Sequence, residues 1–152
     1  MIYIDESGID NNETNPYGWS KKGERCQGSR PGKRGERLSI IGALCHQKFL
    51  APMVYQGYCT AQVIEVWLSE FLLPQVSKGS VIVMDNAPFH KSRRIRELIE
   101  NAGCELIFLP AYSPDLNPIE HWWHKVKTAI RKELSNLNFD VHQAATVAFQ
   151  CL

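Results

Sequence analysis

Three acidic residues stand where they could bind metal ions. Asp5 and Asp85 each close an apolar run, and Glu120 opens a helix-like stretch with 34 residues between it and Asp85. Two divalent cations about 3.5–4 Å apart are held by oxygen ligands, typically a bridging carboxylate flanked by others. One ion lowers the pKa of an attacking water or hydroxyl, and the other stabilises the leaving oxygen. These residue types therefore predict two Mg²⁺ or Mn²⁺ ions and the processing of phosphodiesters.

Each acid also has a structural alternative. Asp5 precedes Glu6-Ser7-Gly8, which is ordinary turn chemistry. Glu120 completes a capping-box pattern with Asn117 as the N-cap residue. Asp85 is harder to explain as a solvated surface residue, because it ends a fully apolar strand and precedes Asn-Ala-Pro. The constellation of three acids is therefore a stronger indication than any one of them.

The elements that must position these acids alternate between strand and helix patterns. Strands are predicted at residues 1–5, 38–45, 49–58, 81–85 and 104–109. Helices are predicted at residues 62–73, from about 91 to 102, from 118 to about 134, and from 140 to the C-terminus. The early strands favour an antiparallel meander, and the later ones, joined by helical crossovers, favour parallel pairing. The predicted fold class is α/β, with Asp5 and Asp85 both at strand carboxyl ends, where ligands gather.

Apolar spacing within these elements predicts which residues face the core. In the helix at 62–73 the core-facing stripe is Ile64, Trp67, Leu68, Phe71 and Leu72. The strand at 104–109, like that at 81–85, is predicted to be buried. Gly103 stands where a helix C′ residue belongs, and Asp140 is the expected N-cap of the last helix.

Length and composition indicate an ordinary globular protein. The 152 residues fit one domain, and 44% hydrophobic with 22% charged residues excludes a disordered chain. No apolar run approaches the ~20 residues that span a bilayer, and no signal peptide precedes the first strand. The five cysteines are odd in number and form no C-x-x-C pair. Cys45, Cys59 and Cys104 lie in apolar segments, which predicts buried, reduced thiols in a cytosolic protein.

Basic residues are concentrated in one glycine-rich segment. It contains Lys21, Lys22, Arg25, Arg30, Lys33, Arg34 and Arg37. Five of the ten glycines lie between Gly18 and Gly35, so a mobile loop or loose hairpin is predicted. It is either a solvated loop or an arm that contacts DNA phosphates. Lys125 and Lys127, with the basic residues at 91–96, would extend such a DNA track along two helices.

Polar residues near the acids offer further contacts. Asn86 and His90 follow Asp85 and could touch metal-bound water or the scissile phosphate. A polar loop packed against the strand end explains them equally well. His121 and His124 have H-x-x-H spacing, but zinc helices place their histidines four apart and no third ligand is evident. A zinc site is therefore not predicted.

Four strings of the sequence carry a family resemblance. They are Tyr3–Gly8 (YIDESG), Gly18–Glu24 (GWSKKGE), Val83–His90 (VMDNAPFH) and Leu109–Glu120 (LPAYSPDLNPIE). In order, over about residues 2–133, they resemble the catalytic domain of DDE transposases, and more narrowly bacterial insertion-sequence transposases of the mariner superfamily. The resemblance implies a ribonuclease H-like fold with Asp5, Asp85 and Glu120 as the metal-binding acids. It also implies cut-and-paste DNA transposition, by hydrolysis at transposon ends and strand transfer into target DNA, usually at a TA dinucleotide.

The same resemblance implies partners and leaves two alternatives open. Family members usually carry an N-terminal helix-turn-helix region, whereas here Met1 stands four residues before Asp5. This region is then either encoded separately or lost from a dead element. We further expect the protein to bind double-stranded DNA and to assemble on it as a homodimer. The expected location is the bacterial cytoplasm, without membrane contact. The alternatives are a ribonuclease H-like nuclease without transposition and a catalytically silent DNA-binding remnant.

Overall fold

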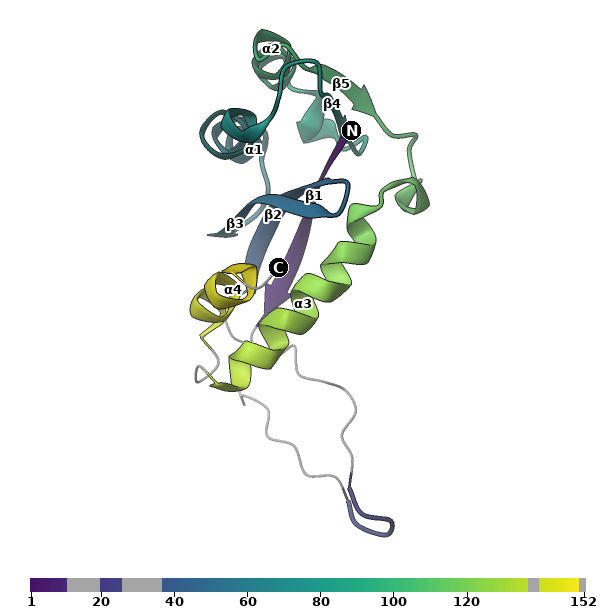
Figure 1. Cartoon of the computed structure of the whole chain (residues 1–152), viewed down its shortest axis with the longest axis vertical. Coiled ribbons are helices and arrows are strands. Elements are labelled where there is room, and N and C mark those ends of the chain that lie inside the picture. Colours follow the sequence, from purple (N-terminus) through teal and green to yellow (C-terminus); the bar gives the residue numbers. More distant parts are fainter. Residues whose placement is uncertain (11–19, 26–36, 137–139, 151–152) are drawn as a thin grey trace.

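A mixed five-stranded sheet forms the centre of the computed structural model, which describes residues 1–10, 20–25, 37–136 and 140–150 (Figure 1). The strands are β1 (Ile2–Asp10), β2 (Arg37–Cys45), β3 (Lys48–Gln56), β4 (Val81–Met84) and β5 (Glu105–Phe108). Their spatial order is β3-β2-β1-β4-β5. The first three strands form an antiparallel meander, and β4 pairs in parallel with both β1 and β5. The predicted α/β mixed sheet is confirmed.

The first strand is longer than predicted, and this moves Asp5. β1 was expected to end at residue 5, but it continues to Asp10, so Asp5 lies in mid-strand and not at a strand carboxyl end. Glu6-Ser7-Gly8 was interpreted as turn chemistry, yet residues 6–10 all pair with β2 in the antiparallel ladder, and Ile9 is buried. Parallel pairing with β4 involves only Ile2 and Tyr3. Asp5 therefore stands just beyond the point where the parallel ladder stops.

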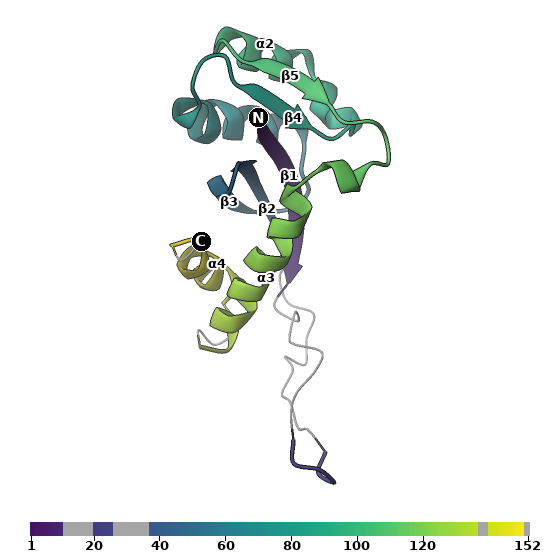
Figure 2. The same ribbon diagram turned by 45° about the vertical axis from the view of Figure 1, so that its right-hand side comes forward.

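Helices cover both faces of the sheet (Figures 1 and 2). On one face, α1 (Ala61–Trp67) and α2 (Arg93–Asn101) pack on a core that includes Ile41. On the other face, α3 (Ile119–Asn136) and α4 (Val141–Gln150) pack on a core that includes Ile40. Ile40 and Ile41 are neighbours in β2, and both are fully buried, because alternate side chains of a strand point to opposite faces.

Two predicted core assignments are wrong. Phe71 was placed in the core stripe but is 44% exposed, whereas Leu72 is fully buried. The cause is a π-helical segment at Leu68–Leu72 after α1, which shifts the apolar stripe around the helix axis; a 3₁₀ turn at Leu73–Gln75 follows it. The strand predicted at 104–109 is not fully buried either. β5 is an edge strand with alternating exposure, and Ile107 is 40% exposed.

The helix ends follow the predicted capping residues closely. Gly103 has φ +75° and follows α2, and its N–H donates to the carbonyl of Glu100. Asp140 caps α4, because its Oδ1 accepts from the N–H of Gln143 at 3.0 Å. The helix predicted from about residue 91 starts at Arg93, since a 3₁₀ turn at Pro88–Lys91 precedes its cap at Ser92. None of the described helices has the length and apolar character to cross a bilayer.

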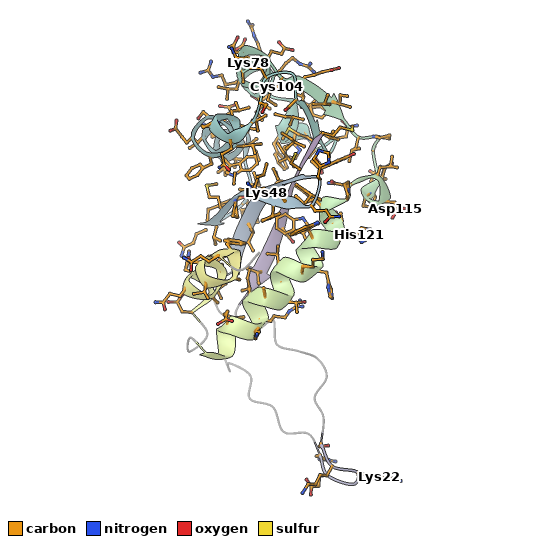
Figure 3. All side chains as sticks on the ribbon, in the orientation of Figure 1. Lys22, Lys48, Lys78, Cys104, Asp115 and His121 are labelled. Carbon is orange, nitrogen blue, oxygen red and sulfur yellow. The ribbon has the colours of Figure 1, made fainter. Side chains whose placement is uncertain are left out.

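The remaining predictions from composition concern the cysteines and the basic segment. Cys45, Cys59 and Cys104 are free thiols, but only Cys104 of these three is buried as predicted, and Cys45 and Cys59 are partly exposed. Of the basic segment, residues 20–25 form an exposed turn, shown by Lys22 in Figure 3, in which the N–H of Glu24 donates to the carbonyl of Lys21. Arg30, Lys33 and Arg34 lie outside the described residues, as do Cys26 and Cys151.

Candidate active site

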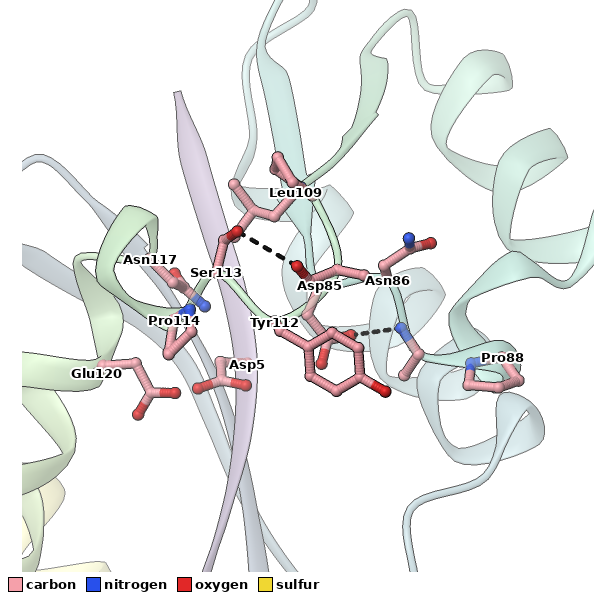
Figure 4. Close-up of a pocket in the computed structure, with 13 residues that line it drawn as sticks. Asp5, Asp85, Asn86, Pro88, Leu109, Tyr112, Ser113, Pro114, Asn117 and Glu120 are labelled. Atoms are coloured by element: carbon pink, nitrogen blue, oxygen red, sulfur yellow. Dashed lines mark hydrogen bonds between the residues drawn. The ribbon is translucent and has the colours of Figure 1, made fainter.

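One pocket brings the three predicted acids together. It has a volume of about 490 Å³ and lies between the end of β4, the middle of β1 and the first turn of α3 (Figure 4). Its polar lining includes Asp5, Asp85, Asn86, Ser113, Asn117 and Glu120. Ala87, Pro88 and the loop at 109–114 complete its wall. Residues far apart in the chain thus meet in one concave surface.

Strand pairing explains why Asp5 and Asp85 are neighbours. Tyr3 lies opposite Val83 in the parallel pair of β1 and β4. Continuing this register by two residues brings Asp5 level with Asp85, where β4 has already ended. The expected parallel pairing is thus present, although only Asp85 follows a strand end.

Asp5 is held by a buried tryptophan. The side chain is 9% exposed, and its Oδ2 accepts a hydrogen bond from Nε1–H of Trp123 at 2.8 Å. Burial raises the pKa of Asp5 to about 7; the Trp123 hydrogen bond opposes this rise, and the negative charges of Glu120 and Glu6 add to it. Asp5 is therefore a carboxyl group that resists ionisation until a positive charge lies nearby.

The orientation of Trp123 follows from aromatic packing. Phe49 meets Trp123 edge to face, with ring centroids 5.6 Å apart, and stacks on Trp122 at 6.1 Å. The Phe49 ring has room because residue 42, the β2 partner of Asp5, is glycine. A Cβ at Gly42 would lie 2.4 Å from Cζ of Phe49. A small residue on β2 thus allows the packing that aims the indole N–H at Asp5.

Asp85 is held by the loop that follows it. Its Oδ1 accepts from the N–H of Ala87 at 3.0 Å and contacts Nδ1 of His90 at 2.5 Å. The hydrogen bond with His90 is the main reason that the pKa of Asp85 is lowered, against the opposing effect of burial, and the Ala87 N–H adds to the lowering. Half of the side chain remains accessible to solvent. Asp85 is therefore ionised and faces the pocket.

His90 is fully buried and contacts two acids. Its Nε2 lies 2.8 Å from Oε1 of Glu6, so the imidazole bridges Glu6 and Asp85. Burial alone would lower the pKa of His90, but the hydrogen bonds to Asp85 and Glu6 outweigh it and raise the pKa to about 9. Of the two predicted possibilities, the structure places His90 behind the strand end, while Asn86 lines the pocket.

Glu120 is not engaged in the predicted capping box. That motif requires the Asn117 side chain to accept from the backbone of Glu120. Instead the Asn117 backbone carbonyl accepts this N–H, at 3.2 Å, and the buried Oδ1 of Asn117 has no hydrogen-bond partner. The Glu120 side chain is exposed and points toward Asp5 (Figure 4). The third acid is thus directed into the pocket rather than back along its own helix.

The donor set fits hard divalent cations. Three carboxylates line this pocket together with Asn117, and carboxylate and amide oxygens are ligands of the kind that Mg²⁺ and Mn²⁺ prefer. As the side chains stand, no three His, Cys, Asp or Glu residues in the described part of the chain converge closely enough to hold one ion. Binding would thus require the acids to draw closer together.

The predicted DNA-contacting residues that the structure describes lie on several different elements. Lys21, Lys22 and Arg25 are exposed on the turn at 20–25, which lies apart from the sheet and from the first turn of α3 (Figure 1). Lys125 is exposed on α3 with its ammonium 4.5 Å from the Trp122 ring, and Lys127 is half-buried. Arg37 starts β2.

Some positive charges on α2 are offset by acids of the same helix. Arg93 and Arg94 pair with Glu97, and Arg96 pairs with Glu100. These pairs are solvated surface contacts, so this part of the predicted DNA track presents less net positive charge than the sequence suggested.

Sequence reasoning missed two residues of the site. Trp123 is 118 positions from its partner Asp5, and Glu6 is 84 positions from His90. Neither contact has a local sequence signal. The one hint was position: Glu6 is next to Asp5 in the sequence, and Trp123 lies about one helical turn after Glu120.

Comparison with known proteins gives consistent similarities. A family model described as DDE superfamily endonuclease matches residues 1–140. The Tc3 transposase of Caenorhabditis elegans is 39% identical over 99 residues, which cover 62% of this chain and 30% of that protein. An insertion element IS630 protein of 39 kDa from Shigella sonnei is 27% identical over 135 residues, covering 87% of this chain and 39% of that protein. The chain thus spans well under half the length of these relatives.

Solved structures confirm the predicted ribonuclease H-like fold. The Mos1 strand transfer complex matches with a TM-score of 0.64 at 18% identity, covering 99% of this chain and 53% of that one. The mariner Mos1 paired-end complex with Mg matches with a TM-score of 0.60 at the same identity and coverage. At this level of identity the likeness shows the fold of the sheet and its flanking helices.

Proposed function

The chain belongs to the DDE superfamily endonucleases, and from this membership we propose that it is the catalytic domain of an insertion-sequence transposase. Its reactions would be DNA strand cleavage and strand transfer in cut-and-paste transposition. The observation that carries the proposal is the single pocket in which Asp5, Asp85 and Glu120 meet on a ribonuclease H-like sheet. The relatives are DNA transposases and an insertion-element protein, which supports the same substrate class.

Asp5, Asp85 and Glu120 would hold two divalent ions, Mg²⁺ or Mn²⁺, as the Mg in the Mos1 complex also suggests. When bound, such ions lower the pKa of the attacking oxygen and stabilise the leaving oxygen. The chain's own part is to present the carboxylates. Trp123 holds one oxygen of Asp5, and the Ala87 N–H and His90 hold one oxygen of Asp85.

Both reactions exchange one bond to phosphorus for another. In cleavage, water attacks a phosphodiester, the bond to the 3′-oxygen breaks, and that oxygen leaves as a 3′-hydroxyl. In strand transfer, this hydroxyl attacks a phosphodiester of the target DNA and a new 3′-hydroxyl departs. The basic residues would bind the DNA backbone: Lys21, Lys22, Arg25, Arg30, Lys33, Arg34, Arg37, Lys125 and Lys127.

The proposal extends to the assembly. Because the chain spans 30–39% of the two relatives, end recognition would need a separately encoded helix-turn-helix subunit or a further part of the protein. A homodimer on DNA would hold two transposon ends together, in the cytoplasm of a bacterium. The alternatives are a nuclease without strand transfer and a silent DNA-binding remnant. The remnant is the second candidate, because the acids of the described residues do not converge closely enough to hold one ion as they stand.

A cleavage and joining assay tests the proposal. The protein is incubated with labelled DNA carrying the element's ends, together with Mg²⁺ or Mn²⁺. We expect metal-dependent nicking that is lost in Asp85→Asn and retained in Asp115→Asn, an exposed acid of the neighbouring loop that does not line the pocket. Joined products would distinguish a transposase from a plain nuclease. Equal behaviour of wild type and Asp85→Asn would refute the assignment of the metal site.

A further inference from the structure

Asp5 and Glu6 are consecutive residues of β1, and they serve opposite faces of the sheet. Asp5 meets Trp123 of α3, whereas Glu6 meets His90, on the 3₁₀ turn that follows β4. This division follows from the alternation of side chains along a strand. One short stretch of β1 therefore contacts both layers that flank the sheet.

The Glu6–His90–Asp85 bridge spans a gap in the sheet. Backbone pairing of β1 with β4 ends at Tyr3 and Val83, so beyond these residues no ladder fixes the two strands. The bridge joins the strands three residues further along β1, with separations of 2.8 Å from Glu6 Oε1 to Nε2 and 2.5 Å from Nδ1 to Asp85 Oδ1. It supplies the lateral contact that backbone hydrogen bonds no longer provide.

The bridge also selects one oxygen of Asp85. Oδ1 receives both the imidazole and the Ala87 N–H, so Oδ2 is the oxygen that these contacts leave for the pocket. His90 is fully buried and the Glu6 side chain is 14% exposed, so the imidazole is fixed from both sides in a site shielded from water. A carboxylate held at one oxygen has fewer orientations to lose when the other binds an ion.

We propose that Glu6 and His90 are positioning residues that hold Asp85 ready to bind a divalent cation, with Glu6 acting on Asp85 through His90. This rests on the proposed function, in which Asp85 is a metal ligand. Removing a residue that hydrogen-bonds to a metal ligand typically weakens metal affinity by about 10–100-fold. A residue that merely stabilises the fold would instead lower the fraction of competent protein at every metal concentration.

Mn²⁺ binding to the isolated chain tests the proposal without DNA. Titrations followed by electron paramagnetic resonance would compare wild type with Glu6→Ala, Glu6→Gln and His90→Ala. We expect about 10–100-fold weaker binding in both alanine variants. Glu6→Gln keeps an acceptor of the same length and should bind within about tenfold of wild type. Glu105→Ala, an exposed glutamate on β5, is the matched control and should leave binding unchanged.

A double-mutant cycle separates positioning from general damage. In an Asp85→Asn background, Glu6→Ala should have no further effect on Mn²⁺ binding, because Glu6 acts through Asp85. Nicking by Glu6→Ala should recover at high Mn²⁺, with a raised metal requirement and a retained maximal rate. Should His90→Ala not fold, the Glu6 variants still decide the question, since Glu6 is partly exposed.

The outcomes distinguish the two levels of the proposal. If wild type binds Mn²⁺ and nicks DNA while Glu6→Ala does the same, or if Glu6→Gln loses as much affinity as Glu6→Ala, the positioning role is refuted and the proposed function stands. If wild type neither binds Mn²⁺ nor nicks DNA, the proposed function fails and the positioning role fails with it.

Discussion

Replacing Asp5 by asparagine should stabilise the metal-free protein. Asp5 is 9% exposed, and its pKa is raised by burial to about 7 from an ordinary value of 3.8. Asparagine has nearly the same shape, and its Oδ1 can still accept the hydrogen bond from Trp123. It carries no charge to bury, so the electrostatic cost of folding at this position disappears.

The size and pH dependence of this effect follow from linkage. Below pH 3.8 the carboxyl group is neutral in both states, and Asp5 imposes no charge cost. As pH rises from 3.8, the unfolded chain ionises first, so the folded state loses stability until pH passes about 7. At about 1.4 kcal/mol per pH unit, the full loss is roughly 4 kcal/mol above pH 7. Asp5→Asn avoids this loss, so its advantage should grow between pH 5 and pH 8.

Urea unfolding in the presence of a chelator measures this difference. At pH 8 we expect Asp5→Asn to exceed wild type by up to roughly 4 kcal/mol, or about 8–16 °C in Tm for a chain of this size. At pH 5 the advantage should fall to roughly 1.5 kcal/mol. Asp115→Asn, at an exposed acid, should change stability by less than about 0.5 kcal/mol. An advantage that is absent at pH 8, or equal at both pH values, would refute the assignment of a raised pKa to Asp5.

Two further predictions concern packing and capping. Gly42→Ala should destabilise the protein by about 1–3 kcal/mol in urea unfolding, because its Cβ would lie 2.4 Å from Cζ of Phe49. Adding Phe49→Leu should recover part of that loss, and independent effects of the two changes would contradict the proposed clash. Asp140→Ala should lower the free energy of unfolding by about 1 kcal/mol, because it removes the cap of α4. Asp140→Asn can still accept from the N–H of Gln143 and should leave stability nearly unchanged. Equal losses of stability in the two variants would contradict a capping role.

How much of this could be predicted from sequence depended on whether the signal was local. Asp85 follows four apolar residues, and Gly103 and Asp140 stand at helix ends, so each was placed correctly by its immediate neighbours. Phe71 was misplaced because a π-helical segment changes the helical period, and no residue type announces it. β1 was cut short because Glu6-Ser7-Gly8 resembles a turn until β2 is present to pair with it.

The site itself depended on contacts that no local pattern encodes. Asp5 and Trp123 are separated by 118 residues, and the pairing of β1 with β4 that brings the acids together involves only two residue pairs. The family resemblance predicted which acids bind metal but not which residues hold those acids in place. For Glu120 the local pattern was misleading. The sequence from Asn117 to Glu120 predicts a capping box, but this motif is not formed and Asn117 Oδ1 has no hydrogen-bond partner.

The extension of β1 to Asp10 explains how one strand can direct Asp5 and Glu6 to opposite faces of the sheet. Asp5 must face α3 to meet Trp123, and Glu6 must face the opposite layer to meet His90. A slip of one residue would exchange these faces, pointing Asp5 at His90 and Glu6 at the indole. Pairing with β4 through two residues is too short to prevent such a slip, whereas nine consecutive pairs with β2 fix the register. The antiparallel ladder that continues past Asp5 to Asp10 therefore determines the geometry of the candidate metal site.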